Sequence, residues 1–139
     1  MPRVFLPIKV FETFEDLQAC ADYWVKQLQL ESWKLKFYLV PQAEMPLEGA
    51  FGCNLMNYES NASKIYIIDK EGIVDGETCC DYCAEQTLVH ELLHLRYNFL
   101  TKPEGSLPDV FWDIEEHRKL DQLATILVAT KYGIRPSEV

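Results

Sequence analysis

Residues 89–95 read VHELLHL and place two histidines, His90 and His94, four positions apart in an apolar run. An α-helix repeats every 3.6 residues, so both imidazoles would lie on one face of a helix, one turn apart. Glu91 would lie beside the first of them. The surrounding leucines predict that this helix is buried. Two imidazoles held on one helix face are typical of a metal site, and the adjacent carboxylate is a candidate base.

Zinc prefers imidazole nitrogen, and a catalytic zinc site takes three protein ligands and leaves one position for water. Glu91 can accept a proton from a water that the metal has made acidic and pass it to a leaving amine, as in the HExxH pattern. A pattern with three fixed positions also arises by chance. The chain, however, has three histidines and places two of them here. Burying such groups without partners would cost roughly 1–3 kcal/mol each. The pattern therefore predicts one Zn²⁺ ion bound by His90 and His94, with Glu91 as the catalytic base.

The third metal ligand is expected in EEHRKLD, residues 115–121. His117 is slightly favoured, because Asp121 follows one helical turn later and could accept a hydrogen bond from the second ring N–H. Glu116 is the alternative. On a helical wheel it shares a stripe with Leu120, so it would point inward, and an inward carboxylate without a metal or a partner is costly. Both side chains remain candidates.

The first half of the chain predicts a helix followed by three strands. TFEDLQACADYWVKQLQL (13–30) has apolar residues at helical spacing, with Thr13 placed to cap the helix N-terminus. SWKLKFYLV (32–40) alternates apolar and polar residues, as a half-buried strand does. AFGCNLMNYES (50–60) is a weaker strand with an internal glycine, and SKIYIIDKEG (63–72) is a stronger one. The turn between them predicts a hairpin.

The second half of the chain predicts two helices. The segment with the two histidines is helical from about Cys80 to Phe99 and is ended by Pro103 and Gly105. A linker, TKPEGSLPDV, leads to the last helix.

That last helix extends from about Phe111 to Tyr132. The order of elements predicts one α+β domain over residues 1–139. It would comprise an N-terminal helix, a small, mostly antiparallel three-stranded sheet, the HExxH helix and a C-terminal helix with the third ligand.

The composition and charge of the chain argue against several classes of protein. The net charge is −9, with 22 acidic against 13 basic residues, which argues against a nucleic-acid partner because phosphate binding needs clustered Lys and Arg. No run of apolar residues is long enough to cross a membrane, and the N-terminus lacks the pattern of a signal peptide. An odd number of cysteines without a secretory signal favours reduced thiols. We therefore expect a cytoplasmic protein without a membrane segment.

Three of the five cysteines, Cys79, Cys80 and Cys83, precede the HExxH helix. Cys80 and Cys83 form a CxxC, which with Cys53 or Cys20 could bind a second, structural zinc ion, or could be a reactive thiol pair at a helix N-terminus. Packing of small buried residues at the start of a helix explains them at least as well. No second metal is predicted.

TLVHELLHLRY (87–97), together with EEHRKLDQLA (115–124), resembles the zincin metallopeptidases, in particular small minigluzincin-like peptidases of phages and bacteria. The resemblance implies a zinc ion, a peptide or protein substrate, and an edge strand, here AFGCNLM, that binds an extended peptide by β-augmentation. In gluzincins the third ligand is a glutamate followed four residues later by an aspartate. Matching Asp121 to that aspartate places His117 at the ligand position. This departure leaves open a three-histidine class, such as the SprT-like proteins, or ligation by Glu116.

The sequence therefore supports two functions. The first is a zinc-dependent metallopeptidase that hydrolyses peptide bonds, with Tyr97 or Tyr132 as candidates to stabilise the oxyanion. The alternative is a catalytically weak, metal-stabilised binding or regulatory module of phage or mobile-element origin. Glu91 argues against the alternative, because a purely structural metal site does not need a base.

Overall fold

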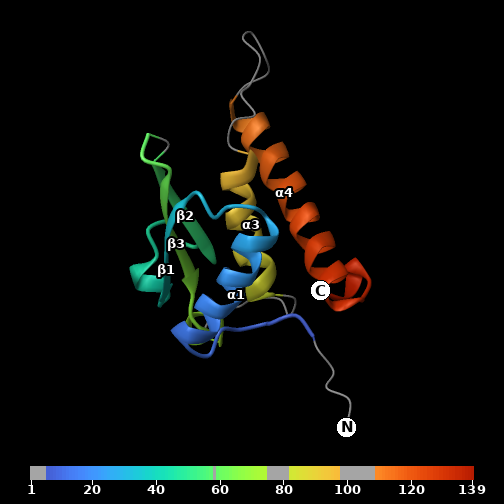
Figure 1. The fold of residues 1–139 in the computed structure, drawn as a ribbon. Helices are drawn as coiled ribbons and strands as arrows, with labels where there is room; N and C mark the ends of the chain where they lie inside the picture. Colours follow the sequence, from blue (N-terminus) through green and yellow to red (C-terminus); the bar gives the residue numbers. More distant parts are fainter. Residues whose placement is uncertain (1–5, 58, 75–81, 98–108) are drawn as a thin grey trace.

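The fold is α+β, with helices gathered on one side of a small sheet (Figure 1). The computed structural model describes residues 6–57, 59–74, 82–97 and 109–139. The elements in chain order are α1 (Phe14–Gln27), β1 (Lys34–Val40), η1 (Gln42–Glu44), β2 (Gly52–Asn57), β3 (Ala62–Ile68), α2 (Lys70–Val74), α3 (Ala84–Tyr97), α4 (Asp109–Tyr132) and η2 (Pro136–Glu138). Helix α3 lies between the sheet and α4, so one face of α3 meets the strands and another meets α4.

The three strands form a mixed sheet in the order β1-β3-β2. Strands β2 and β3 pair antiparallel, which confirms the predicted hairpin. Strand β1 pairs parallel to β3, with Lys34 opposite Ala62 and Val40 opposite Ile68. The expectation of a mostly antiparallel sheet is therefore wrong for this pair. Strand β3 is the most buried of the three and takes the central position, where Ile65 and Ile67 are fully buried.

The helices agree with the sequence pattern where they are described. The hydroxyl of Thr13 accepts a hydrogen bond from the backbone N–H of Asp16, which confirms the predicted cap of α1. The start and end predicted for the HExxH helix, and most of the linker after it, lie outside the described residues. Helix α2 was not expected. The carboxylate of Asp69 accepts a hydrogen bond from the N–H of Gly72 at its start. Within the described ranges, no helix is both long and apolar enough to cross a bilayer.

The first turn of α3 is anchored by the N-terminal segment and by a buried carboxylate, Glu85. The backbone N–H groups of Ala84 and Glu85 donate to the carbonyls of Lys9 and Ile8, which satisfies two donors that a helix start leaves open. Glu85 has no exposed surface. Four donors surround its carboxylate: the backbone N–H of Ile8, the Trp24 indole, the Lys131 ammonium and the Tyr132 hydroxyl. These bonds join α3 to α1 and to the end of α4.

Candidate metal centre

Three imidazoles converge between α3 and α4. His90 and His94 lie one turn apart on α3, and His117 comes from α4. Nε2 of His90 is 3.2 Å from Nδ1 of His117 and 3.2 Å from Nε2 of His94. One nitrogen from each ring lies within 4.8 Å of the other two, which is close enough for all three to bind one metal ion. A tetrahedral zinc ion with Zn–N bonds of 2.0–2.1 Å separates its ligand nitrogens by about 3.3–3.4 Å.

The tautomer of His90 also fits a cation at this point. Oδ1 of Asp121 lies 3.0 Å from Nδ1 of His90 and can accept its proton. In a neutral ring the proton is then on Nδ1, so Nε2 presents a lone pair to the other two imidazoles. The N–H groups of His94 and His117 cannot both donate good hydrogen bonds to this one lone pair. A cation, in contrast, can accept a lone pair from each of the three rings. The donor set therefore fits a transition-metal ion.

Asp121 contacts His90 on the facing helix, and not His117 as the sequence analysis expected. Its Oδ1 also accepts a 2.8 Å hydrogen bond from Nε2 of Gln86, one turn before His90. The hydrogen bond from His90 contributes most to lowering the pKa of Asp121 below its ordinary value. The expected pairing is wrong because Asp121 reaches across to α3 rather than back along α4.

Glu116 does not point inward. Its side chain is 46% exposed, and its carboxylate lies 3.7 Å from Nδ1 of His94, at the rim of the cluster. The helical-wheel prediction assumed that the side of α4 with Glu116 faces an apolar core. It is wrong because this part of α4 faces the imidazole cluster. His117, and not Glu116, therefore completes the group of three side chains that lie close enough together to hold a metal ion.

His94 is prepared to bind a metal as a neutral ligand. Burial, together with the neighbouring rings of His90 and His117, lowers its pKa to about 4. The ring is therefore unprotonated at neutral pH. A neutral imidazole presents the lone pair that a metal needs.

The candidate base, Glu91, is buried on the side of α3 that faces β2. Only 7% of its surface is exposed. Burial raises the pKa of its carboxyl to about 7, although the neighbouring His90 acts in the opposite direction. A general base works best when its pKa lies near the working pH.

Strand β2 holds α3 closely at Glu91. The side-chain amide of Asn54 donates a 3.0 Å hydrogen bond to the backbone carbonyl of Glu91, and Ser63 donates in turn to Asn54. A Cβ atom added to Gly52 would lie 2.7 Å from Cγ2 of Thr87 and 3.3 Å from Oε2 of Glu91. A side chain at this position would force Thr87 to shift, so the edge strand passes directly beside the candidate base.

Sequence reasoning did not identify Gln86, Asn54 or the role of Gly52. Gln86 had a signal, since it precedes His90 by four residues and so shares its helix face. The glycine inside a strand was also a signal, because such a residue often marks a close approach of another element. Asn54 had none, because its partner is a carbonyl on another element.

None of the remaining described candidates belongs to the three-imidazole cluster, and Cys79 and Cys80 lie outside the described residues. The hydroxyl of Tyr132 donates to Glu85, so it is engaged at the opposite end of α3. Tyr97 packs at the edge of the core. Cys20 and Cys83 are buried free thiols, and Cys53 is a half-buried one.

Comparisons with protein-family models, with curated proteins and with solved structures find no match to this chain.

Proposed function

We propose that this chain is a zinc-dependent metallopeptidase. The observation that carries the proposal is the convergence of His90, His94 and His117 on one point, with Glu91 next to His90 on the same helix. Three imidazole ligands leave one position of a tetrahedral zinc ion open, which is the pattern of a catalytic site rather than a structural one. The buried carboxyl of Glu91 supports the same interpretation, because a structural site has no use for a base.

A zinc ion at this centre supplies Lewis-acid chemistry, since it makes a water acidic and polarises the carbonyl of the scissile bond. Side chains of the protein supply the other functions that the reaction needs. Glu91 accepts the proton of the attacking water and delivers it to the leaving amine. Asp121, positioned by Gln86, keeps the proton of His90 on Nδ1, so that Nε2 remains a ligand. Glu116 lies beside Nδ1 of His94 and favours the same arrangement in that ring.

The substrate in this proposal is an extended peptide that adds to β2 as a further strand. Strand β2 is at the edge of the described sheet, and its Gly52 lies against Glu91. Backbone hydrogen bonds to an edge strand bind peptides with little dependence on their sequence. A peptide on this edge would run past the base.

Replacement of Glu91 by glutamine tests the proposal. The zinc-loaded parent should cleave a pool of denatured protein substrates, and Glu91→Gln should lower kcat by a factor of about 10²–10⁴. The zinc content should remain the same in both proteins. The fragments are measured by mass spectrometry.

The same experiment separates the two functions. Cleavage at an equal rate in the Glu91→Gln variant would remove Glu91 from the mechanism. A parent that binds zinc and cleaves nothing in the pool would favour the metal-stabilised binding module.

A further inference from the structure

The sheet has a second face, which α1, α3 and α4 do not cover. The side chains of Ile65 and Ile67 point to the helices and are fully buried. Side chains alternate along a strand, so Lys64 and Tyr66 point to the opposite face. On the neighbouring strand Lys36 pairs with Lys64 in register, and so it shares that face. Figure 1 shows α1, α3 and α4 on the other side.

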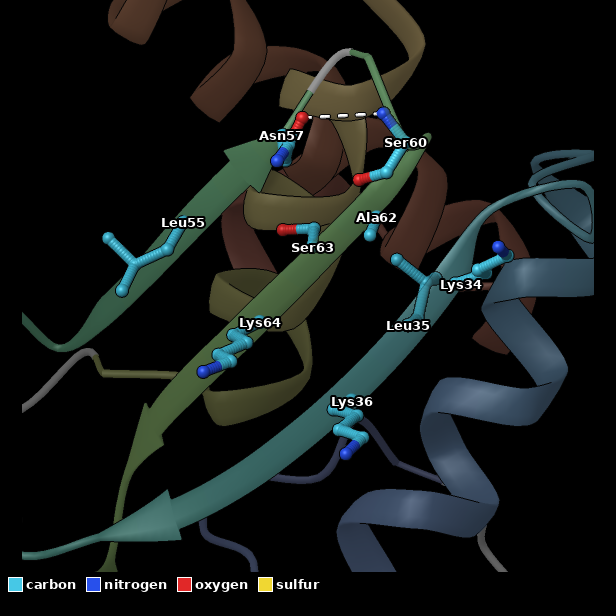
Figure 2. Close-up of a pocket in the computed structure, with 9 residues that line it drawn as sticks. All are labelled: Lys34, Leu35, Lys36, Leu55, Asn57, Ser60, Ala62, Ser63 and Lys64. Carbon is cyan, nitrogen blue, oxygen red and sulfur yellow. Dashed lines mark hydrogen bonds between the residues drawn. The ribbon is translucent and has the colours of Figure 1, made fainter.

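This open face contains a pocket of about 520 Å³. Its lining is drawn in Figure 2: Lys34, Leu35, Lys36, Leu55, Asn57, Ser60, Ala62, Ser63 and Lys64. Three exposed lysines line it, and none of the described acidic residues does. We call it the lysine pocket. It shares no residue with the metal centre, where His90 and His94 face α4.

The three lysines lack a counter-charge within the described part of the chain, where none of them forms an ion pair. Lys36 and Lys64 lie directly opposite one another on adjacent strands. Like charges in this position destabilise a sheet. An unbalanced positive pocket is also unusual on a chain whose net charge is −9. The arrangement is accounted for if the lysines bind an anionic partner.

We infer that the lysine pocket binds an acidic segment of a polypeptide. Glutamate or aspartate side chains of that segment would pair with Lys36 and Lys64. An aliphatic side chain would cover Leu55, which is 47% exposed at the pocket wall. Oδ1 of Asn57 already accepts from the backbone N–H groups of Glu59 and Ser60 (Figure 2), and the side-chain N–H groups of Asn57 and the hydroxyl of Ser60 could bond the backbone of the segment. This inference goes beyond the proposed peptidase activity and does not depend on it.

The lining favours a peptide over a single-stranded nucleic acid. Proteins that bind single strands stack the bases on exposed aromatic rings. Among the described residues, no aromatic side chain lines the pocket. Tyr38 and Tyr66, on the same face, stack on each other with ring centroids 4.8 Å apart and planes 16° from parallel. The overall negative charge also repels a polyphosphate more strongly than a short acidic peptide.

The test is fluorescence anisotropy with the full chain and three labelled probes. The first is a short blocked peptide of alternating glutamate and leucine, the second replaces glutamate by glutamine, and the third is an oligothymidylate. The glutamate peptide should bind best, and its binding should weaken as the ionic strength rises. The double variant Lys36→Gln/Lys64→Gln should weaken it roughly three- to tenfold.

The matched control is Lys9→Gln/Lys119→Gln, which changes the net charge equally at two exposed lysines away from the pocket. It should bind the glutamate peptide as the parent does, and circular dichroism should show all variants folded. If both double variants bind the glutamate peptide equally weakly, the change in net charge alone explains the loss of binding and the inference is overturned. Equal binding of the glutamine peptide, no binding of the glutamate peptide, or tighter binding of the oligothymidylate would also overturn it.

Discussion

The hydrogen bond between Asp121 and His90 links two side chains from different helices, and it decides which nitrogen of His90 is free. With its proton on Nδ1, the ring directs the lone pair of Nε2 to the point where the other two imidazoles meet. Gln86 donates to the same carboxylate oxygen and so limits its movement. Metal affinity in this centre should therefore depend on Asp121, although Asp121 is not itself a ligand.

Asp121→Asn should lower the zinc affinity of the chain about 10- to 100-fold, because the amide is a weaker acceptor for the N–H of His90 and carries no charge. The affinity is measured by competition with a chromogenic chelator. Asp22→Asn is the matched control, since Asp22 is an exposed carboxylate on α1 that accepts a hydrogen bond from Gln18. An unchanged affinity in Asp121→Asn would show that Asp121 does not orient a ligand.

Glu85 should make the stability of the fold depend on pH. Burial alone would raise the pKa of its carboxyl, but the hydrogen bonds from Lys131, Tyr132, Trp24 and Ile8 outweigh burial and bring it below 4.5. The folded state thus has the lower pKa. The stabilisation is complete above pH 4.5 and is lost as the pH falls through the folded pKa.

Glu85→Gln should therefore lower the free energy of unfolding near neutral pH by about 3–5 kcal/mol, because Lys131 keeps a largely buried charge without its partner. The difference from the parent should shrink as the pH falls below 4.5. Urea unfolding of the metal-free proteins at several pH values measures both. Glu12→Gln, which removes an exposed ion pair with Lys70, should change little. If the difference in unfolding free energy between Glu85→Gln and the parent does not change with pH, the lowered pKa of Glu85 is contradicted.

At the scale of elements, the packing of β2 against α3 connects the sheet to the candidate base. Gly52 allows the two backbones to approach, and the amide of Asn54 holds the carbonyl of Glu91. The position of Glu91 should therefore respond to changes in β2. Even one methyl group added at Gly52 should affect the position of Glu91.

Gly52→Ala should destabilise the fold by about 1–3 kcal/mol, because the new methyl group would overlap Cγ2 of Thr87. It should also lower the rate of peptide hydrolysis, since it crowds the Glu91 carboxyl. Adding Thr87→Ser removes the methyl group at 2.7 Å and should restore part of the stability. Thermal unfolding of the single and double variants is the measurement. A double variant no more stable than Gly52→Ala would show that the close contact with Thr87 is not the cause.

At the scale of the whole molecule, the sequence predicted what depends on local pattern. Hydrophobic spacing and the Thr13 cap located α1, and the turn between two β-rich segments located the hairpin. The parallel pairing of β1 with β3 was missed, because it joins segments that are far apart in the chain.

In the candidate site too, the local pattern predicted some features and missed those that depend on packing between elements. Helical spacing placed His90 above His94, and His117, the favoured third ligand, lies close to both of them. The partner of Asp121 and the exposure of Glu116 depend on how α4 packs against α3. No periodicity within one helix contains that information.

The most direct test of the metal centre is the zinc content per chain, measured by elemental analysis after zinc is offered and excess metal is removed. The parent should hold about one ion, as a three-imidazole site with one open position does. His94→Ala and His117→Ala should lose it, and Glu116→Ala should retain it, because the Glu116 carboxylate lies at the rim of the cluster. A parent that holds no zinc would contradict the account. So would loss of zinc in Glu116→Ala with retention in His117→Ala.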